Sequence, residues 1–336
     1  MKKIFVCLLA VAALASCQKN EIISTVGGPA IAFENAFVDK ATKADPSTTT
    51  ASIADFEVWG YMGDETGVVF NEELVKKGGS DWTYANTQYW VPGKTYTFQA
   101  VNPTADNNVV VNAEQGAGNF ETISFVNAKG IVDLLYDTKT VSVPAEASSM
   151  AKVGLEFKHL LSKVNFTFTN GFDNANSTIV ISDIKMTAPA AGKVDVLKNF
   201  AWILEEGKET TLEFGNVNGG EKLAAGASST CADERLTIPA GADQEYVVTF
   251  TVQLYQGEVL AVESKLQSVV KGAVLEVGKA YNFTAEINAS NILGPEQELL
   301  PIEFTVVKVD EWVEAEQVSS VLEDTSVAEG ESYMLV

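Results

Sequence analysis

The chain has 336 residues, of which 46% are hydrophobic, and an excess of acidic over basic residues gives it a net charge of -22. A surface this acidic repels phosphate along most of its extent, which excludes a nucleic-acid-binding protein. The length and hydrophobic content are sufficient for two cores of ordinary size, so we expect two domains.

The first seventeen residues have the pattern of a bacterial lipoprotein signal peptide. Lys2 and Lys3 precede an apolar run over residues 4–14, which is too short to span a bilayer. The run ends in Leu-Ala-Ser-Cys, with two small residues directly before Cys17. We therefore predict cleavage of residues 1–16, acylation of Cys17 and anchoring in the outer membrane at the cell surface. The alternative is a plain secretion signal with an incidental cysteine, which also exports the protein.

The cysteines offer no disulfide framework. Of the three in the chain, Cys7 leaves with the signal and Cys17 carries lipid, so Cys231 has no partner within the chain. Stability must therefore come from burial of apolar side chains. Residues 17–29 are polar with two glycines and are predicted to be a tether.

A short strand and a basic loop follow the predicted tether. Residues 30–38 alternate so that Ile31, Phe33 and Phe37 share one face, with Ala36 on the other. The polar stretch that begins at residue 39 contains Lys40, Lys43 and a proline. Such a segment is typical of an exposed loop that proteases can cut.

The chain from residue 53 to 312 is predicted to be strand after strand, with no comparable helical periodicity. Alternation is clearest over residues 163–168, 247–254, 281–287 and 302–307. Strands at residues 82–90 and 95–101 flank a Val-Pro-Gly-Lys turn and predict a hairpin. Residues 141–152 are a plausible interdomain segment. The fold predicted is all-β, with tandem antiparallel β-sandwich domains at residues 30–150 and 151–312.

The last 24 residues, 313–336, are acidic and contain no basic residue. Their apolar positions include Val318, Val321, Tyr333 and Leu335. One interpretation is a disordered, solvated end. The other is an unpaired strand that awaits a partner.

No constellation of residues predicts catalysis or metal binding. His159 is the one histidine, it has no evident nucleophile and acid beside it, and the usual zinc and calcium spacings are missing from the sequence. We therefore predict no enzyme activity, no cofactor and no metal. Four tryptophans (Trp59, Trp82, Trp90 and Trp202) could stack on sugars if exposed, although tryptophans in strands are usually part of a core.

Several phrases together resemble the fimbrillin family, the subunits of type V fimbriae of anaerobic Gram-negative bacteria. The most specific is Phe-Lys-His-Leu-Leu-Ser-Lys-Val-Asn-Phe at residues 157–166. Others are the signal ending at Cys17, Ile-Ala-Phe at 31–33 followed by Ala-Thr-Lys-Ala at 41–44, Tyr-Trp-Val-Pro at 89–92, Asp-Leu-Leu-Tyr at 133–136 and Ile-Glu-Phe-Thr-Val at 302–306.

The resemblance implies two transthyretin-like β-sandwiches and assembly by donor-strand exchange. In that scheme a protease cuts the exported lipoprotein after a basic residue, the first strand leaves, and a strand from a neighbouring subunit fills the groove. Here residues 30–38 would be the removable strand, with Ile31, Phe33 and Phe37 filling the groove. Residues 313–336 would be the candidate donor, with other fimbrial subunits as partners.

One departure from the family concerns processing. The family's cleavage follows arginine, but the first arginine here is Arg235, so a cut must follow Lys40 or Lys43 or use another protease. An uncut chain would be an anchor or tip subunit. A lipoprotein that stays monomeric and binds glycans or proteins on host or bacterial surfaces is the alternative from a different functional class.

Overall fold

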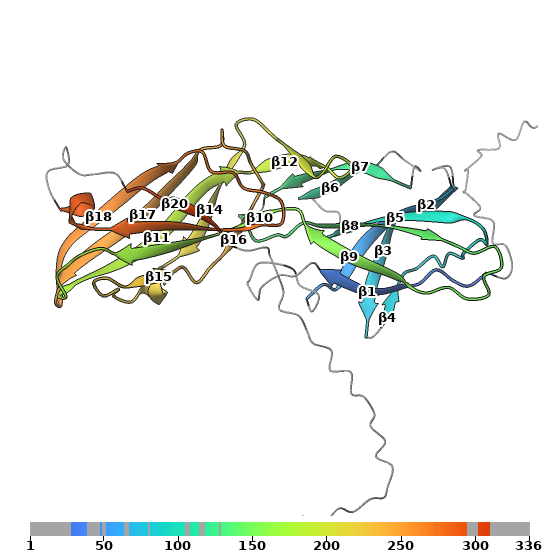
Figure 1. The fold of residues 1–336 in the computed structure, drawn as a ribbon, viewed down its shortest axis with the longest axis horizontal. Helices are drawn as coiled ribbons and strands as arrows, with labels where there is room; N and C mark the ends of the chain where they lie inside the picture. The colour runs from blue at the N-terminus through green and yellow to red at the C-terminus, as the bar shows by residue number, and fades with distance from the viewer. Residues whose placement is uncertain are drawn as a thin grey trace, which may run out of the picture.

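A computed structural model describes residues 28–38, 48, 52–63, 67–79, 81–104, 108–113, 118–127, 129–293 and 302–309. Strands dominate these residues and form one closed ring and three sheets in an elongated molecule (Figure 1). The all-β class predicted from the alternating pattern is confirmed. The described residues contain no helix that is both long and apolar enough to cross a membrane.

The N-terminal part is a ring of seven strands. They are β1 (Phe33–Val38), β2 (Asp55–Met62), β3 (Gly67–Gly78), β4 (Asp81–Thr83), β5 (Thr95–Asn102), β8 (Leu135–Ser142) and β9 (Val153–His159). Their order around the ring is β1-β4-β3-β2-β5-β8-β9. The ring closes because β1 pairs antiparallel with β4 on one side and parallel with β9 on the other.

A second sheet takes strands from both sides of the predicted domain boundary. Its order is β13-β12-β7-β6, and the bounds are β6 (Val109–Ala113), β7 (Phe120–Val126), β12 (Ala191–Asp195) and β13 (Ala201–Leu204). Division at residue 150 also assigns β9 to the second domain, whereas β9 lies in the ring, where its alternating Val153, Leu155 and Phe157 are buried. The two halves of the chain are therefore interleaved.

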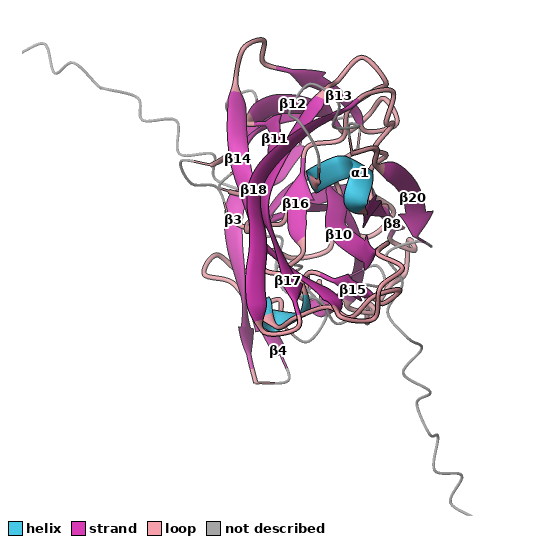
Figure 2. Ribbon diagram, turned by 90° about the vertical axis from the view of Figure 1, so that its left-hand side faces the viewer, coloured by secondary structure: helices cyan, strands magenta, loops and turns pink. Residues whose placement is uncertain are grey.

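The C-terminal part is a sandwich of two sheets. One contains β10 (Ser162–Asn170), β15 (Ser228–Thr230), β16 (Arg235–Thr237), β19 (Ala280–Ile287) and β20 (Thr305–Val309). The other has the order β14-β11-β17-β18, with β11 (Ser177–Pro189), β14 (Glu209–Gly215), β17 (Tyr246–Gln256) and β18 (Val259–Val270). The two sheets lie face to face (Figure 2). Aromatic pairs join them across the core, such as Phe168 and Phe250, whose ring centroids are 5.0 Å apart.

Two short helical turns, η1 (Asn218–Gly220) and α1 (Ala289–Ile292), complete the described fold. The parallel pairing of β10 with β19 is a second exception to the antiparallel arrangement expected from the sequence. Alternation shows which faces are buried but gives no strand direction, so it could not distinguish parallel from antiparallel pairs.

Breaks in alternation coincide with strands that are covered on both faces. In β2, Val58 points into the ring core, whereas Trp59 belongs to a separate core under the β6–β7 sheet. The ring centroids of Trp59 and Phe120 are 5.1 Å apart. Neighbouring residues on opposite faces are thus both buried. The same strand supports two cores.

The hairpin predicted from residues 82–90 and 95–101 is wrong. β4 ends at Thr83 and pairs with β1 and β3, while β5 pairs with β2 and β8. The segment between them is held by other contacts: the Glu73 carboxylate accepts hydrogen bonds from the Ala85 and Asn86 amides at 3.0 and 3.2 Å. Long-range polar contacts of this kind leave no signal in local sequence.

Candidate functional site: the first strand in its ring

The segment that begins before β1 has backbone partners on both sides. Along β9 the register runs from Phe33 opposite Val153 to Val38 opposite Phe157. On the other side, the Ile31 amide donates to the Gln88 carbonyl at 2.8 Å. Loss of this strand would leave unpaired N–H and C=O groups along both neighbours, which is the template for a replacement strand.

The side chains of this segment occupy the centre of the ring. Ile31, Phe33, Ala36 and Val38 are each at most 3% exposed. The Phe33 ring lies 5.7 to 6.0 Å from four other aromatic rings, those of Phe56, Phe70, Tyr84 and Phe98. Each large apolar side chain buried in this way contributes about 1.5–3 kcal/mol. Removal of the strand would open an aromatic-lined cavity.

A bulge in β1 changes which residues face inward. The register with β9 shifts between Glu34 and Ala36, so one extra residue enters the strand and the phase of alternation reverses. The expectation that Ala36 lies on the opposite face from Phe33 is wrong, because both side chains are buried in the same core inside the ring. The backbone of Phe37 pairs with Glu156, but its side chain lies outside the described residues.

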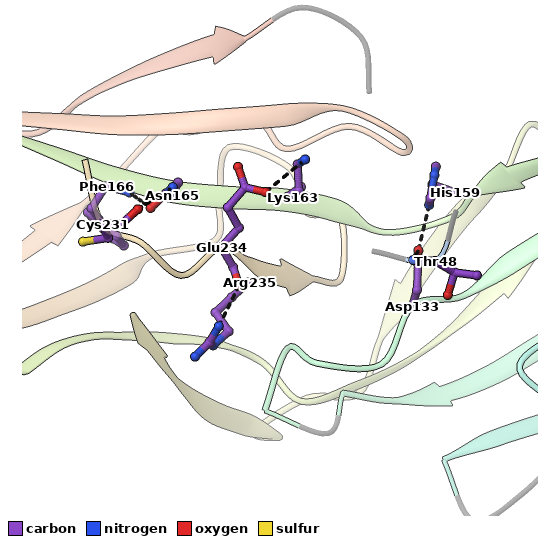
Figure 3. A network of polar contacts seen from close by, with 9 residues as sticks. All are labelled: Thr48, Asp133, His159, Lys163, Asn165, Phe166, Cys231, Glu234 and Arg235. Carbon is purple, nitrogen blue, oxygen red and sulfur yellow. Dashed lines mark hydrogen bonds and ion pairs between the residues drawn. The ribbon is translucent and has the colours of Figure 1, made fainter. Parts of the chain in front are cut away.

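The chain beyond β1 is fastened to the body at Thr48. The Thr48 amide donates to Asp133 Oδ2 at 2.9 Å, and His159 Nδ1 lies 2.9 Å from the same oxygen (Figure 3). The Leu134 amide donates to Asp133 Oδ1 at 2.9 Å. Both the Asp133 and His159 side chains are buried. His159 thus has a structural partner that local sequence does not predict, although Asp133 and His159 each lie in a phrase that resembles the family.

A second polar group lies where the ring meets the sandwich. Lys163 Nζ is 3.1 Å from Glu234 Oε2, and Arg235 Nη2 donates to Asp233 Oδ2 at 3.2 Å. Nearby, the Asn165 side chain donates to the Cys231 carbonyl (Figure 3). Burial raises the pKa of the Cys231 thiol to about 12, which makes it a poor nucleophile.

Neither polar group has the arrangement of side chains expected of a catalytic or metal-binding centre. In the part of the chain that the structure describes, no three His, Cys, Asp or Glu side chains gather in a way that could hold a metal ion. The distinctive feature of the described residues is therefore a short first strand that closes a ring. The sequence that follows this strand contains Lys40 and Lys43.

Comparison with known proteins shows the family of the chain. The family model described as fimbrillin-like matches residues 42–308, most of the chain. The chain belongs to the fimbrillin-like family. The resemblance predicted from the sequence phrases is thereby confirmed. The matched region begins after β1 and ends within β20, so the two predicted exchange segments, residues 30–38 and 313–336, lie outside it.

Solved structures share the fold of this family member. A fimbrial protein from Bacteroides vulgatus has a TM-score of 0.60 and 13% identity, over 84% of this chain and 99% of that one. A candidate cell adhesion protein from Bacteroides ovatus has a TM-score of 0.50 and 12% identity, over 86% and 99% of the respective chains. At such low identity the similarity concerns the fold alone. None of the curated proteins matches the chain.

Several predicted site residues lie outside the described residues. They are the lipidation site Cys17, the processing sites Lys40 and Lys43, and the donor positions Val318, Val321, Tyr333 and Leu335. Of the tryptophans considered as a sugar platform, Trp59, Trp82 and Trp90 are buried and Trp202 is half-buried. The Trp202 indole donates to the Leu160 carbonyl at 3.0 Å, so it is also part of the fold.

Proposed function

We propose that the protein is a structural subunit of cell-surface fimbriae, exported as a lipoprotein precursor and assembled by donor-strand exchange. The observation that carries the proposal is β1, whose buried side chains help to close the ring and whose following sequence contains two lysines, Lys40 and Lys43. Family membership supports the fimbrial class. The Bacteroides vulgatus fimbrial protein supports the same assignment through its fold.

Cleavage would turn β1 from a chain segment into a bound peptide. Val38 ends β1 and Thr48 is tied to Asp133, so a cut after Lys40 or Lys43 falls between two fixed points. β1 is then held only by noncovalent contacts. An incoming strand restores the backbone hydrogen bonds and refills the aromatic cavity, so exchange needs little net free energy.

The donor in this proposal is the acidic tail, residues 313–336, of a neighbouring subunit. Val318, Val321, Tyr333 and Leu335 supply apolar side chains for the cavity that Ile31, Phe33 and Phe37 are proposed to fill in the precursor. Cys17 holds the uncut precursor at the outer membrane through its lipid. The partners are therefore other fimbrial subunits.

A non-polymerising anchor or tip subunit is the second candidate. It is favoured by one observation, the lack of arginine in the sequence before Arg235. A monomeric glycan-binding lipoprotein is supported less well, because the tryptophans that would form its platform are mostly buried.

The N-terminal sequence of protein sheared from cells tests the proposal. A mature chain that begins at Ala41 or Ala44 is expected, and replacement of both lysines (Lys40→Gln with Lys43→Gln) should leave the precursor uncut. Protein that begins at Cys17 in assembled fimbriae would contradict cleavage and support the anchor.

A further inference from the structure

Among the described strands, β18 is the longest one at an open sheet edge. Among the described residues it pairs only with β17, so its other side presents backbone N–H and C=O groups without a strand partner. It has 12 residues, whereas the other edge strands, β6, β13, β14, β15 and β20, have three to seven. A long open edge with no proline invites pairing with another chain.

The two faces of β18 differ in chemistry. Glu263 and Lys265 lie opposite Gln253 and Thr251 of β17 and are exposed on the outer face. Val262 and Leu266 lie on the inner face and pack against the sandwich core while remaining half-buried. An added strand must therefore match charge on one face and apolar side chains on the other.

A second copy of the same strand meets both conditions in one register. If two copies of β18 pair antiparallel about a two-fold axis through Ser264, Glu263 of each copy lies opposite Lys265 of the other. On the inner face, Val262 of each copy then lies opposite Leu266 of the other. An axis at Glu263 or at Lys265 would instead place like charges opposite each other, which destabilises a pair.

The side chains at this edge are available for such pairing. The Gln253 amide donates to Glu263 Oε2 at 2.7 Å, which holds the carboxylate at the outer face. Lys265 makes no ion pair with any described residue. By contrast, the edge strand β14 carries Glu209 and Glu213 on its exposed face, which disfavours pairing with a second copy.

We propose that β18 is a self-association surface through which a second copy of this chain pairs antiparallel about Ser264. The two β14-β11-β17-β18 sheets then form one continuous sheet of eight strands, with an interface of two-fold symmetry. The surface is separate from β1 and its loop. It therefore joins uncut subunits side by side and does not depend on strand exchange.

Ionic strength bears on how this association is observed. Two copies with a net charge of -22 each repel one another at long range. At physiological salt the screening length is about 8 Å, which removes most of that repulsion while the direct Glu263–Lys265 contacts persist in weakened form. Association should therefore be measured at physiological salt or above.

Charge reversal tests the proposed register. The uncut full-length chain, in a non-ionic detergent, is examined by sedimentation velocity over a range of concentrations. Glu263→Lys and Lys265→Glu are each expected to weaken the dimer about tenfold or more, because each creates two like-charge pairs. The double variant with both reversals restores the opposite pairs and should dimerise like the wild type. A mixture of the two single variants should form a mixed dimer.

Three outcomes would overturn the proposal. One is a wild-type chain that stays monomeric at every concentration. Another is equal dimerisation of the wild type, both single variants and the double variant, which would show that Glu263 and Lys265 play no part in recognition. The third is a dimer that survives charge reversal but dissociates when residues 310–336 are deleted, which would show that the tail makes the contact. Both charged residues are exposed, so the variants should fold normally.

Discussion

At the scale of single residues, Asp133 holds the chain that follows the predicted cleavage sites, at Thr48, to the body of the molecule. Its two carboxylate oxygens accept hydrogen bonds from the Thr48 and Leu134 amides, and one of them also lies 2.9 Å from Nδ1 of the buried His159 ring. Buried polar groups that lose their partner retain the full cost of desolvation. The fixed position of Thr48 therefore depends on one carboxylate.

Replacement of Asp133 tests this dependence. Asp133→Ala should lower the free energy of unfolding by about 3 kcal/mol, and Asp133→Asn by less, because an amide oxygen can still accept a backbone hydrogen bond. Urea denaturation measures both. Asp81→Ala, which breaks the exposed Asp81–Lys152 pair, is the control and should change stability by less than about 1 kcal/mol. Equal effects of Asp133→Ala and Asp81→Ala would contradict the assignment.

The buried thiol of Cys231 should make the free energy of unfolding depend on pH in the alkaline range. Its pKa rises from the ordinary 9.0 to about 12 because the folded protein buries the thiol. The unfolded chain therefore loses this proton first, and the thiol's contribution to stability is present below about pH 9 and is lost as pH rises to about 12. The free energy of unfolding should fall more steeply over this range in the wild type than in Cys231→Ala. Parallel pH curves for the two proteins would refute the burial effect.

At the scale of elements, β1 shows what the sequence could and could not predict. Its position and the inward direction of Ile31 and Phe33 follow from alternation before the bulge. The bulge and the parallel pairing with β9 arise from contacts with residues more than a hundred positions away, and no local pattern encodes them. For the same reason, the tie between Asp133 and His159 was not predicted.

Truncation of one β1 side chain should loosen the strand. Phe33→Ala removes a buried ring from among four aromatic neighbours and should cost about 3–5 kcal/mol. Glu34→Ala, at an exposed position of the same strand, is the matched control and should have little effect. After cleavage in the loop, the Phe33→Ala precursor should also release the β1 peptide faster, as followed by mass spectrometry. Equal release from both variants would indicate that the ring core does not hold β1.

At the scale of the whole molecule, the interleaved strands explain how the subunit could lose β1 and remain folded. The β7–β12 pair and the core around Trp59 and Phe120 connect the ring to the sandwich independently of β1. The sequence predicted the strand-rich character of both halves, but a single boundary at residue 150 could not describe a sheet built from both. Pairing between distant strands, rather than composition, sets this architecture.

The most direct test of strand exchange starts from the chain without residues 1–17. A lysine-specific protease is added, and the products are followed by size exclusion with mass detection. The proposed function predicts an early cut after Lys40 or Lys43, loss of the β1 peptide and concentration-dependent multimers larger than a dimer. The same protein ended at Trp312 should be cut but should not form them. A cut chain that retains β1, or multimers that persist without the tail, would contradict assembly by exchange of this strand.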